Sequence, residues 1–277
     1  MKRRLIQLCA ALLYNLNLKG FAEASIYKGK SKGLCVPGLN CYSCPGAVGS
    51  CPLGTLQNAL SAMDRKLPFY ILGVLLLFGV TMGRTICGFL CPFGLVQELL
   101  YKIPVPKIKK NRVTQELSKV KYVILAVFVI ILPVVFKAAS GLPVPAFCKY
   151  ICPAGTLEGG IPLVLLDDSL SGLAGALFHW KVLVLAVILV SACFLYRRFC
   201  RILCPLGAIY SLFAPVALLG VRIDRDTCVD CGRCVRTCKM DVRQVGDREC
   251  IQCGECMKEC NVDAIYWKKP WDVKSKK

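Results

Sequence analysis

Histidine is almost absent from this sequence of 277 residues, in which His179 is the only example. A haem held between two histidines therefore has no ligand pair here. Zinc sites usually combine histidine with cysteine, so any metal chemistry in this chain is expected to use thiolates alone. His179 stands beside Trp180 where an apolar run begins, and we interpret it as an interfacial residue rather than as a ligand.

Acidic residues are also scarce, with 17 Asp and Glu against 36 Lys and Arg and a formal net charge of +19. Such a balance could indicate a nucleic-acid partner. Membrane topology explains the basic excess without one, so we expect no nucleic acid as a partner. A cleavable leader is not expected either, because the apolar run after the basic Met1–Arg4 ends at Tyr14–Asn15 without a small-residue cleavage site.

Apolar residues, by contrast, make up 56% of the chain, and the mean hydropathy is +0.56. Three runs predict transmembrane helices near the short end of the roughly 17–25 residues that a crossing needs. They are Leu67–Gly83, Lys121–Phe136 and Trp180–Tyr196. A fourth run, Leu5–Leu18, is short and holds polar residues, so it either spans the membrane or lies at its interface. The sequence therefore predicts an α-helical membrane protein with three or four transmembrane helices.

The charges between these runs predict their orientation. Basic residues gather in the loop at 84–121 and at the exit of the third run, whereas the loop at 137–180 has few. The positive-inside rule places the basic side in the cytoplasm. We expect a multi-pass protein of the cell (inner) membrane, with its C-terminal region in the cytoplasm and with residues 35–51 and 148–152 on the outer side.

Cysteine is the most informative residue, with 20 in the chain. Disulfide frameworks belong to short secreted chains, whereas the cysteines here repeat short spacings that favour metal. Near the C-terminus, two runs follow C-x2-C-x2-C-x3-C, the bacterial ferredoxin pattern in which the fourth cysteine of each run ligates the other 4Fe–4S cluster. The predicted ligands are Cys228, Cys231, Cys234 and Cys260 for cluster 1, and Cys250, Cys253, Cys256 and Cys238 for cluster 2.

These clusters predict a C-terminal α+β ferredoxin domain at 221–277, after a membrane domain at 1–220. Gly232 and Gly254 are expected to let the backbone bend closely around the clusters, where a side chain would obstruct. Two zinc sites could also use eight cysteines, but this repeated spacing suits them poorly.

A second motif, Cys-Pro-x-Gly followed by an apolar helical pattern, recurs in the predicted membrane domain. Proline suits the first turn of a helix, so each cysteine is expected at a helix N-terminus. There the backbone N–H groups and the helix dipole stabilise a thiolate and the anionic cluster it holds. The copies begin at Cys51, Cys91, Cys152 and Cys204, and the last three have another cysteine four residues earlier, at Cys87, Cys148 and Cys200. The repetition indicates an internal duplication.

Each C-x3-C-P pair supplies two ligands, whereas a 4Fe–4S cluster needs four. The topology brings four cysteines together at the cytoplasmic face, and we name them the inner set: Cys87, Cys91, Cys200 and Cys204. They hold a membrane cluster, or they are structural or redox thiols. Arg84, close to Cys87, either offsets cluster charge or snorkels to the membrane surface.

At the outer face, the remaining pair meets an upstream segment. The candidates for this outer set are Cys148, Cys152, Cys51, Cys44 and Cys41. Cys51 is the surest upstream ligand because it carries the motif, and the sequence does not decide which other residue completes the set. Disulfides among these residues and Cys35 are the alternative, since the outer compartment can be oxidising.

The C-x3-C-P pairs between apolar runs, joined to a two-cluster ferredoxin tail, resemble the membrane-bound polyferredoxin family of 4Fe-4S binding proteins, which includes NapH-, NosR- and CcoG-type proteins. The resemblance covers most of the chain from about Cys41 onward. It implies membrane electron transfer through iron held by the inner set and the ferredoxin cysteines. The Cys148/Cys152 pair and the segment at 40–45 go beyond the two-pair family pattern, and no flavin-binding domain of the NosR type is expected. We therefore do not assign this chain the respiratory role of those family members.

We accordingly expect transmembrane electron transfer through two to four 4Fe–4S clusters, linking a cytoplasmic donor or acceptor to the membrane or to an outer-face redox partner. The alternatives are a quinol/quinone–ferredoxin oxidoreductase subunit, and a redox sensor or metal-reducing assembly factor. The expected partners are membrane lipid, a cytoplasmic ferredoxin or flavodoxin and an outer-face acceptor, with quinone as an alternative. Electron transfer needs no catalytic acid or base, so no catalytic residue is assigned.

Overall fold

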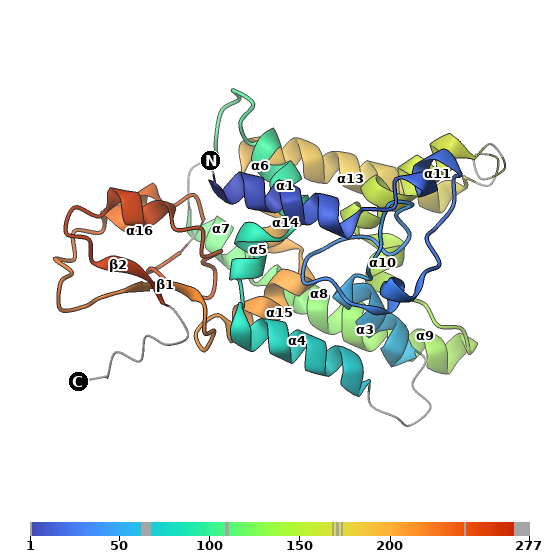
Figure 1. Ribbon diagram of the computed structural model, residues 1–277, viewed down its shortest axis with the longest axis horizontal. Coiled ribbons are helices and arrows are strands. Elements are labelled where there is room, and N and C mark those ends of the chain that lie inside the picture. The colour runs from blue at the N-terminus through green and yellow to red at the C-terminus, as the bar shows by residue number, and fades with distance from the viewer. Residues whose placement is uncertain are drawn as a thin grey trace.

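The computed structural model describes residues 2–61, 68–108, 111–167, 169, 172, 174–240 and 242–268, and it is mostly helical. Four helical rods run roughly along the long axis of the molecule (Figure 1). They are α1 (Lys2–Tyr14), α4 (Phe69–Thr81), a rod from Val120 to Ser140, and α13 (Ala176–Phe194). All four apolar runs are therefore helical, although Leu67, the expected start of one span, lies outside the described residues.

The rod from Val120 to Ser140 changes its winding in the middle. Its segments are α8 (Val120–Ile124), the π-helical η2 (Leu125–Ile131) and α9 (Leu132–Ser140). Pro133 is the second residue after the π-helical segment. Because proline has no N–H and its ring crowds the carbonyl one turn earlier, a wider π turn before it accommodates the missing hydrogen bond.

In the described part of the chain, two helical stretches are long and apolar enough to cross a membrane, Val113–Ser140 and Ala176–Phe194. Helix α4 is apolar but has only 13 residues, which makes it about 20 Å long against a hydrocarbon core of about 30 Å. By length and composition alone, two of the expected spans could cross a membrane, and α4 is a shorter apolar helix.

Every Cys-Pro-x-Gly motif begins a helix, as predicted. The helices are α3 (Pro52–Ser61), α6 (Pro92–Leu100), the segment of η3 (Gly155–Gly160) with α11 (Ile161–Leu166), and α15 (Pro205–Phe213). The last three follow a short helix that carries the earlier cysteine of the pair: α5 (Thr85–Phe89), α10 (Ala146–Tyr150) and α14 (Arg198–Ile202). A unit of short helix, cysteine, proline and helix is thus repeated three times.

The first copy of the motif has an irregular segment in place of the short helix. It contains α2 (Lys19–Ala22), η1 (Lys30–Gly33) and an isolated bridge between Cys35 and Ser50. Helix α7 (Arg112–Leu117) precedes the Val120–Ser140 rod. The irregular segment lies with α10 and α11 at the end of the molecule that is far from the strands (Figure 1).

Residues 220–268 form a small module at the opposite end (Figure 1). Its two strands pair antiparallel, with Gly220 opposite Lys268. Its elements are β1 (Gly220–Ile223), α16 (Arg233–Thr237), η4 (Glu255–Glu259) and β2 (Ile265–Lys268). Gly232 and Gly254 precede the two helices with φ of +66° and +74°, a conformation that strains other residues. Both glycines therefore permit the tight turns that the sequence predicted. Residues 269–277 of the expected domain lie outside the described residues.

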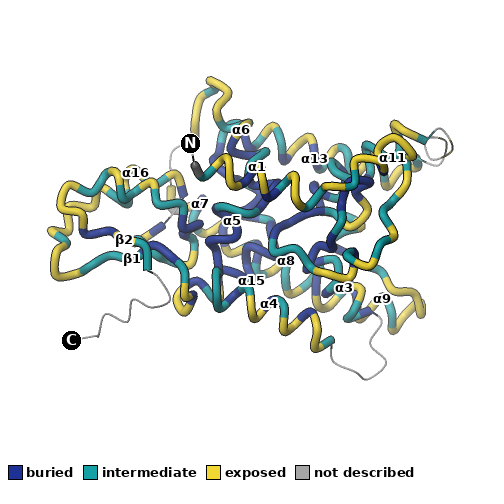
Figure 2. The backbone as a smooth tube through the Cα atoms, in the orientation of Figure 1, coloured by how far each residue is buried: buried dark blue, intermediate teal, exposed yellow. Residues whose placement is uncertain are grey.

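The core runs through the middle of the helical rods, and their outward surfaces are exposed (Figure 2). Many of the cysteines belong to this core, together with aromatic residues such as Phe93 and Phe199. The cysteine-bearing turns are therefore packed inside the bundle.

Candidate metal centres

The eight cysteines of the C-terminal module gather in the two groups that their spacing predicts. A cavity of about 270 Å³ is lined by Cys228, Cys231, Cys234 and Cys260. A second cavity is lined by Cys238, Cys250, Cys253 and Cys256. The fourth cysteine of each run therefore faces the first three of the other run.

Burial disfavours ionisation of the thiols in this module. Burial, reinforced by the neighbouring Cys250 and Cys253, raises the pKa of Cys256 to about 12. Burial likewise raises the pKa of Cys234 and of Cys253. Because metal ligands must be thiolates, a cationic iron core would supply the positive charge that these crowded sulfurs need in order to ionise.

The inner set is assembled from two distant parts of the chain. The turn between α5 and α6 supplies Cys87 and Cys91, and the turn between α14 and α15 supplies Cys200 and Cys204. Cys91 lies near Cys200, and Cys204 lies near Cys87 and Cys91. All four residues are buried. The structure therefore brings the predicted inner set together in a buried interior.

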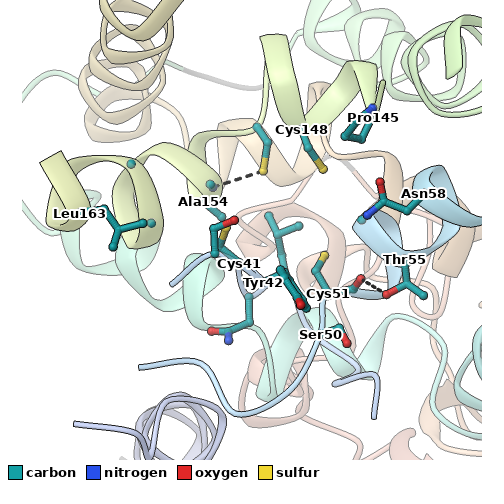
Figure 3. A pocket seen from close by; sticks show the side chains of 18 of the residues that line it. Cys41, Tyr42, Ser50, Cys51, Thr55, Asn58, Pro145, Cys148, Ala154 and Leu163 are labelled. Atoms are coloured by element: carbon teal, nitrogen blue, oxygen red, sulfur yellow. Dashed lines mark hydrogen bonds between the residues drawn. The ribbon is translucent and has the colours of Figure 1, made fainter. Parts of the chain in front are cut away.

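The outer cysteines surround a cavity of about 720 Å³ (Figure 3). Four of them line it: Cys41, Cys51, Cys148 and Cys152. Cys152 lies near the other three. Cys44 and Cys35 do not line this cavity. All twenty cysteines are free, so no disulfide links the outer group.

Among the residues that the structure describes, no three His, Cys, Asp or Glu side chains gather as closely as the ligands of one metal ion do. The four thiolates of a 4Fe–4S cluster each bind a different iron, and they stand farther apart than the ligands of a single ion. Each four-cysteine group has the number of thiolates that one such cluster needs.

The glycine of the Cys-Pro-x-Gly motif contacts the motif sulfur. The Gly155 N–H donates to Cys152 Sγ at 3.4 Å, and the Gly207 N–H donates to Cys204 Sγ at 3.3 Å. A Cβ on Gly155 would lie 3.7 Å from Cys152 Sγ and 3.8 Å from Cys41 Sγ. The helix N-terminus therefore points its donors at the sulfur, as the motif predicted.

Arg84 is fully buried beside the inner set, so the expectation that it snorkels to the surface is wrong. Its Nη1 donates to the Arg248 carbonyl at 3.0 Å and to the Glu249 carboxylate at 3.1 Å. Its Nε and Nη2 have no hydrogen-bond partner in the described structure, and Cys87 and Cys200 are among its charged neighbours. A buried guanidinium with two unused donors fits an anionic group held by these thiols.

The C-terminal module docks onto the inner set. A Cβ on Gly88 would meet the Ile251 carbonyl oxygen at 2.3 Å, so the turn after Cys87 touches the turn after Cys250 backbone to backbone. Glu249 accepts a hydrogen bond from Lys121 Nζ at 2.5 Å in addition to the one from Arg84. Buried charges therefore fasten the module where two cysteine groups approach each other.

Sequence reasoning missed four polar residues that reach across these sites. They are Gln57, Gln97, Glu158 and Tyr210. Each is the sixth residue after a motif cysteine, and each bonds to the opposite loop. The shared spacing was the available signal, although it does not by itself reveal what the side chains contact.

A family model for a 4Fe-4S binding domain matches residues 50–70, 67–111, 122–161 and 177–223. These ranges hold all four Cys-Pro-x-Gly motifs and lie outside the ferredoxin-type cysteine runs. No solved structure matches the chain.

Three curated relatives are similar to this chain. An uncharacterized protein of Methanocaldococcus jannaschii is 30% identical over 61% of this chain and 64% of its own length. YccM of Escherichia coli, whose name describes a candidate electron transport protein, is 23% identical over 70% of this chain and 54% of its own length. The methylamine utilization ferredoxin-type protein MauN of Paracoccus denitrificans is 26% identical over 70% of this chain and 62% of its own length. The chain thus spans between half and two thirds of these relatives.

Proposed function

This chain belongs to the 4Fe-4S binding domain family, and from that premise we propose that it is an electron-transfer protein that conducts electrons across a membrane through four 4Fe–4S clusters. The proposed ligands are Cys228, Cys231, Cys234 and Cys260; Cys238, Cys250, Cys253 and Cys256; Cys87, Cys91, Cys200 and Cys204; and Cys41, Cys51, Cys148 and Cys152. Each cluster supplies a one-electron redox couple. The protein holds them in order and excludes water.

The observation that carries this proposal is the continuity between neighbouring groups. The contact of Gly88 with the Ile251 carbonyl joins the inner set to the nearer ferredoxin group. On the other side, the backbone of Leu39 lies beside the Cys91 thiol, and the backbone of the next residue, Asn40, lies beside the Cys51 thiol. A single peptide therefore links the inner and outer sets, which favours a continuous path of four centres.

A membrane setting is supported by the distribution of polarity. Large apolar side chains such as Leu12, Leu76 and Val187 are exposed on the rods, whereas Arg84 and Arg197 are fully buried. An exposed apolar belt around a charged interior is what a hydrocarbon solvent favours. We propose that the rods span the inner membrane, that residues 1–220 form the membrane domain, and that a ferredoxin domain from residue 221 onward lies in the cytoplasm.

The outer cavity favours a second candidate. Its walls include Tyr70, Leu163 and Lys181 beside the outer cysteines, and its volume of about 720 Å³ is within the range of small-molecule sites. A quinol could donate electrons there, which would make the chain a quinol–ferredoxin oxidoreductase subunit. In the leading proposal, the cavity instead faces an outer protein acceptor, and a ferredoxin or flavodoxin serves the cytoplasmic end.

The first test is anaerobic purification of the full chain with iron and sulfide analysis. Four clusters correspond to about sixteen irons per chain, and about eight would leave only the ferredoxin pair and overturn the membrane path.

The second test uses the chain reconstituted in sealed vesicles that enclose ferricyanide, with reduced ferredoxin outside as electron donor. Molecules oriented with the module outward should reduce the enclosed ferricyanide at a rate set by protein content. No reduction above that of protein-free vesicles would contradict transmembrane conduction. Cluster reduction by a quinol alone would then select the oxidoreductase, and failure of both routes would leave a redox sensor or assembly factor.

A further inference from the structure

The residue six positions after each motif cysteine always bonds to the opposite loop, but it is a glutamine, a glutamate or a tyrosine. Gln57 follows Cys51, and Gln97 follows Cys91 at the same spacing. The other two copies carry Glu158 and Tyr210 at this position, and among the described residues these side chains bond backbone groups. The Glu158 carboxylate accepts the Cys41 N–H at 2.6 Å, and the Tyr210 hydroxyl donates to the Pro37 carbonyl at 2.9 Å. The two glutamines do something further.

Gln97 on α6 reaches the opposite pair of the inner set. Its Oε1 accepts the Phe199 N–H at 3.0 Å, and its Nε2 donates to Cys200 Sγ at 3.1 Å. Gln97 is fully buried. The side chain therefore binds both the backbone that carries a proposed ligand and the sulfur of that ligand.

Gln57 on α3 repeats this arrangement in the outer set. Its Oε1 accepts the Phe147 N–H at 2.9 Å, and its Nε2 donates to Cys148 Sγ at 3.3 Å. It too is fully buried. Two sites built from different segments thus share one contact, in which a glutamine six residues after one motif cysteine binds the first cysteine of the facing pair.

The contact fixes which end of the amide faces the sulfur. A backbone N–H can only donate, so the atom that meets Phe199 or Phe147 must be the amide oxygen. The NH₂ group must then point at the sulfur, and the usual ambiguity of an amide orientation is removed. Each glutamine consequently presents a donor, and never an acceptor, to the thiolate.

We propose that Gln97 and Gln57 are positioning residues that also raise the reduction potentials of the inner and outer clusters, respectively. The inference rests on the proposed function, because it assigns both thiolates to clusters. One-electron reduction adds a negative charge that the cluster shares with its thiolates. An N–H donor to sulfur in a dry interior stabilises the reduced form more than the oxidised form.

The test compares Gln97→Met with Gln57→Met in the full chain, in lipid nanodiscs, by electron paramagnetic resonance during a redox titration. Methionine keeps the length of the side chain and removes the donor. At the midpoint potential of the wild-type cluster, the ratio of reduced to oxidised cluster should fall roughly tenfold, which is about 59 mV for one electron. Each variant should shift the midpoint potential of a different cluster and leave the potentials of the other three unchanged. Each variant is therefore the control for the other.

A second measurement works on the unsubstituted protein. Labelling the glutamine side-chain amide with ¹⁵N should change the nitrogen hyperfine coupling of the reduced membrane clusters, and Gln97→Met should remove that coupling from one of them. A purely structural glutamine would give no such coupling. Unshifted potentials with full iron content would overturn the inference, whereas a wild-type chain with only about eight irons would instead overturn the proposed function.

Discussion

The inner and outer sets are built on the same scaffold but lie in different surroundings. Both combine motif cysteines at helix N-termini with a glutamine bond to the facing pair. The inner set is sealed and has Arg84, whose free donors lie beside its thiols. The outer set opens on a cavity of about 720 Å³ and has the Glu158 carboxyl near Cys41.

This difference separates the reduction potential of a cluster from its access to a redox partner. A buried guanidinium favours the more negative, reduced state of a neighbouring cluster, so we expect the higher potential at the inner set. An open cavity favours exchange with a partner, so we expect access at the outer set. In the second candidate, a quinol that donated electrons at the outer set would then deliver them downhill to the inner set.

The largest effect should come from replacing Cys41, which lines the outer cavity, whereas its neighbour Cys44 does not line it. Cys41→Ser should lose the outer cluster, reducing iron from about sixteen to about twelve per chain and abolishing conduction across vesicles. Cys44→Ser should keep full iron content and conduction, because this residue does not line the cavity. Iron analysis checks both variants, and equal losses in the two would contradict the assignment of Cys41.

Arg84→Gln should lower the potential of the inner cluster and leave that of the outer cluster unchanged. A charge about 6 Å away at an effective dielectric constant of about 20 contributes roughly 2–3 kcal/mol, or on the order of 100 mV. Lys121 still holds Glu249 in this variant, so the module should remain docked. A redox titration measures the shift, and the exposed Arg4→Gln should show none.

Gly88→Ala should weaken the docking of the module on the inner set without affecting the outer set. The added Cβ would meet the Ile251 carbonyl oxygen at 2.3 Å, and overpacking of this kind costs about 1–3 kcal/mol. Hydrogen exchange should increase at the contact around Ile251, and electron transfer from the module to the inner cluster should slow. Gly73→Ala is the matched control, because a Cβ there meets nothing within 4 Å. Equal behaviour of the two variants would show that the contact is unimportant.

Glu158→Gln should have the smallest effect, a modest rise in the potential of the outer cluster. The amide oxygen can still accept the Cys41 N–H, so the loop should keep its place, and only the negative charge is lost. Redox titration of this variant beside Arg84→Gln should show opposite shifts at different clusters. A shift of the inner cluster would contradict the separation of the two sites.

The sequence by itself determined the local parts of this protein. Two cysteine runs of fixed spacing predicted which residues of the module face each other, because such short loops leave few ways to surround a cluster. Proline after each motif cysteine predicted where the helices begin, since it is favoured in the first turn. Apolar runs predicted the helical rods.

Only the tertiary structure decided which distant residues these local parts contact. Spacing could not choose Cys41 over Cys44, because that choice depends on which of them faces α10 and η3 across the outer cavity. Nor could it show that Arg84 is buried against the module or that Gln57 and Gln97 bond the facing cysteines. Such contacts join residues about ninety to more than one hundred and sixty positions apart. Only the packing of distant segments brings them within hydrogen-bond distance, and local sequence patterns do not encode it.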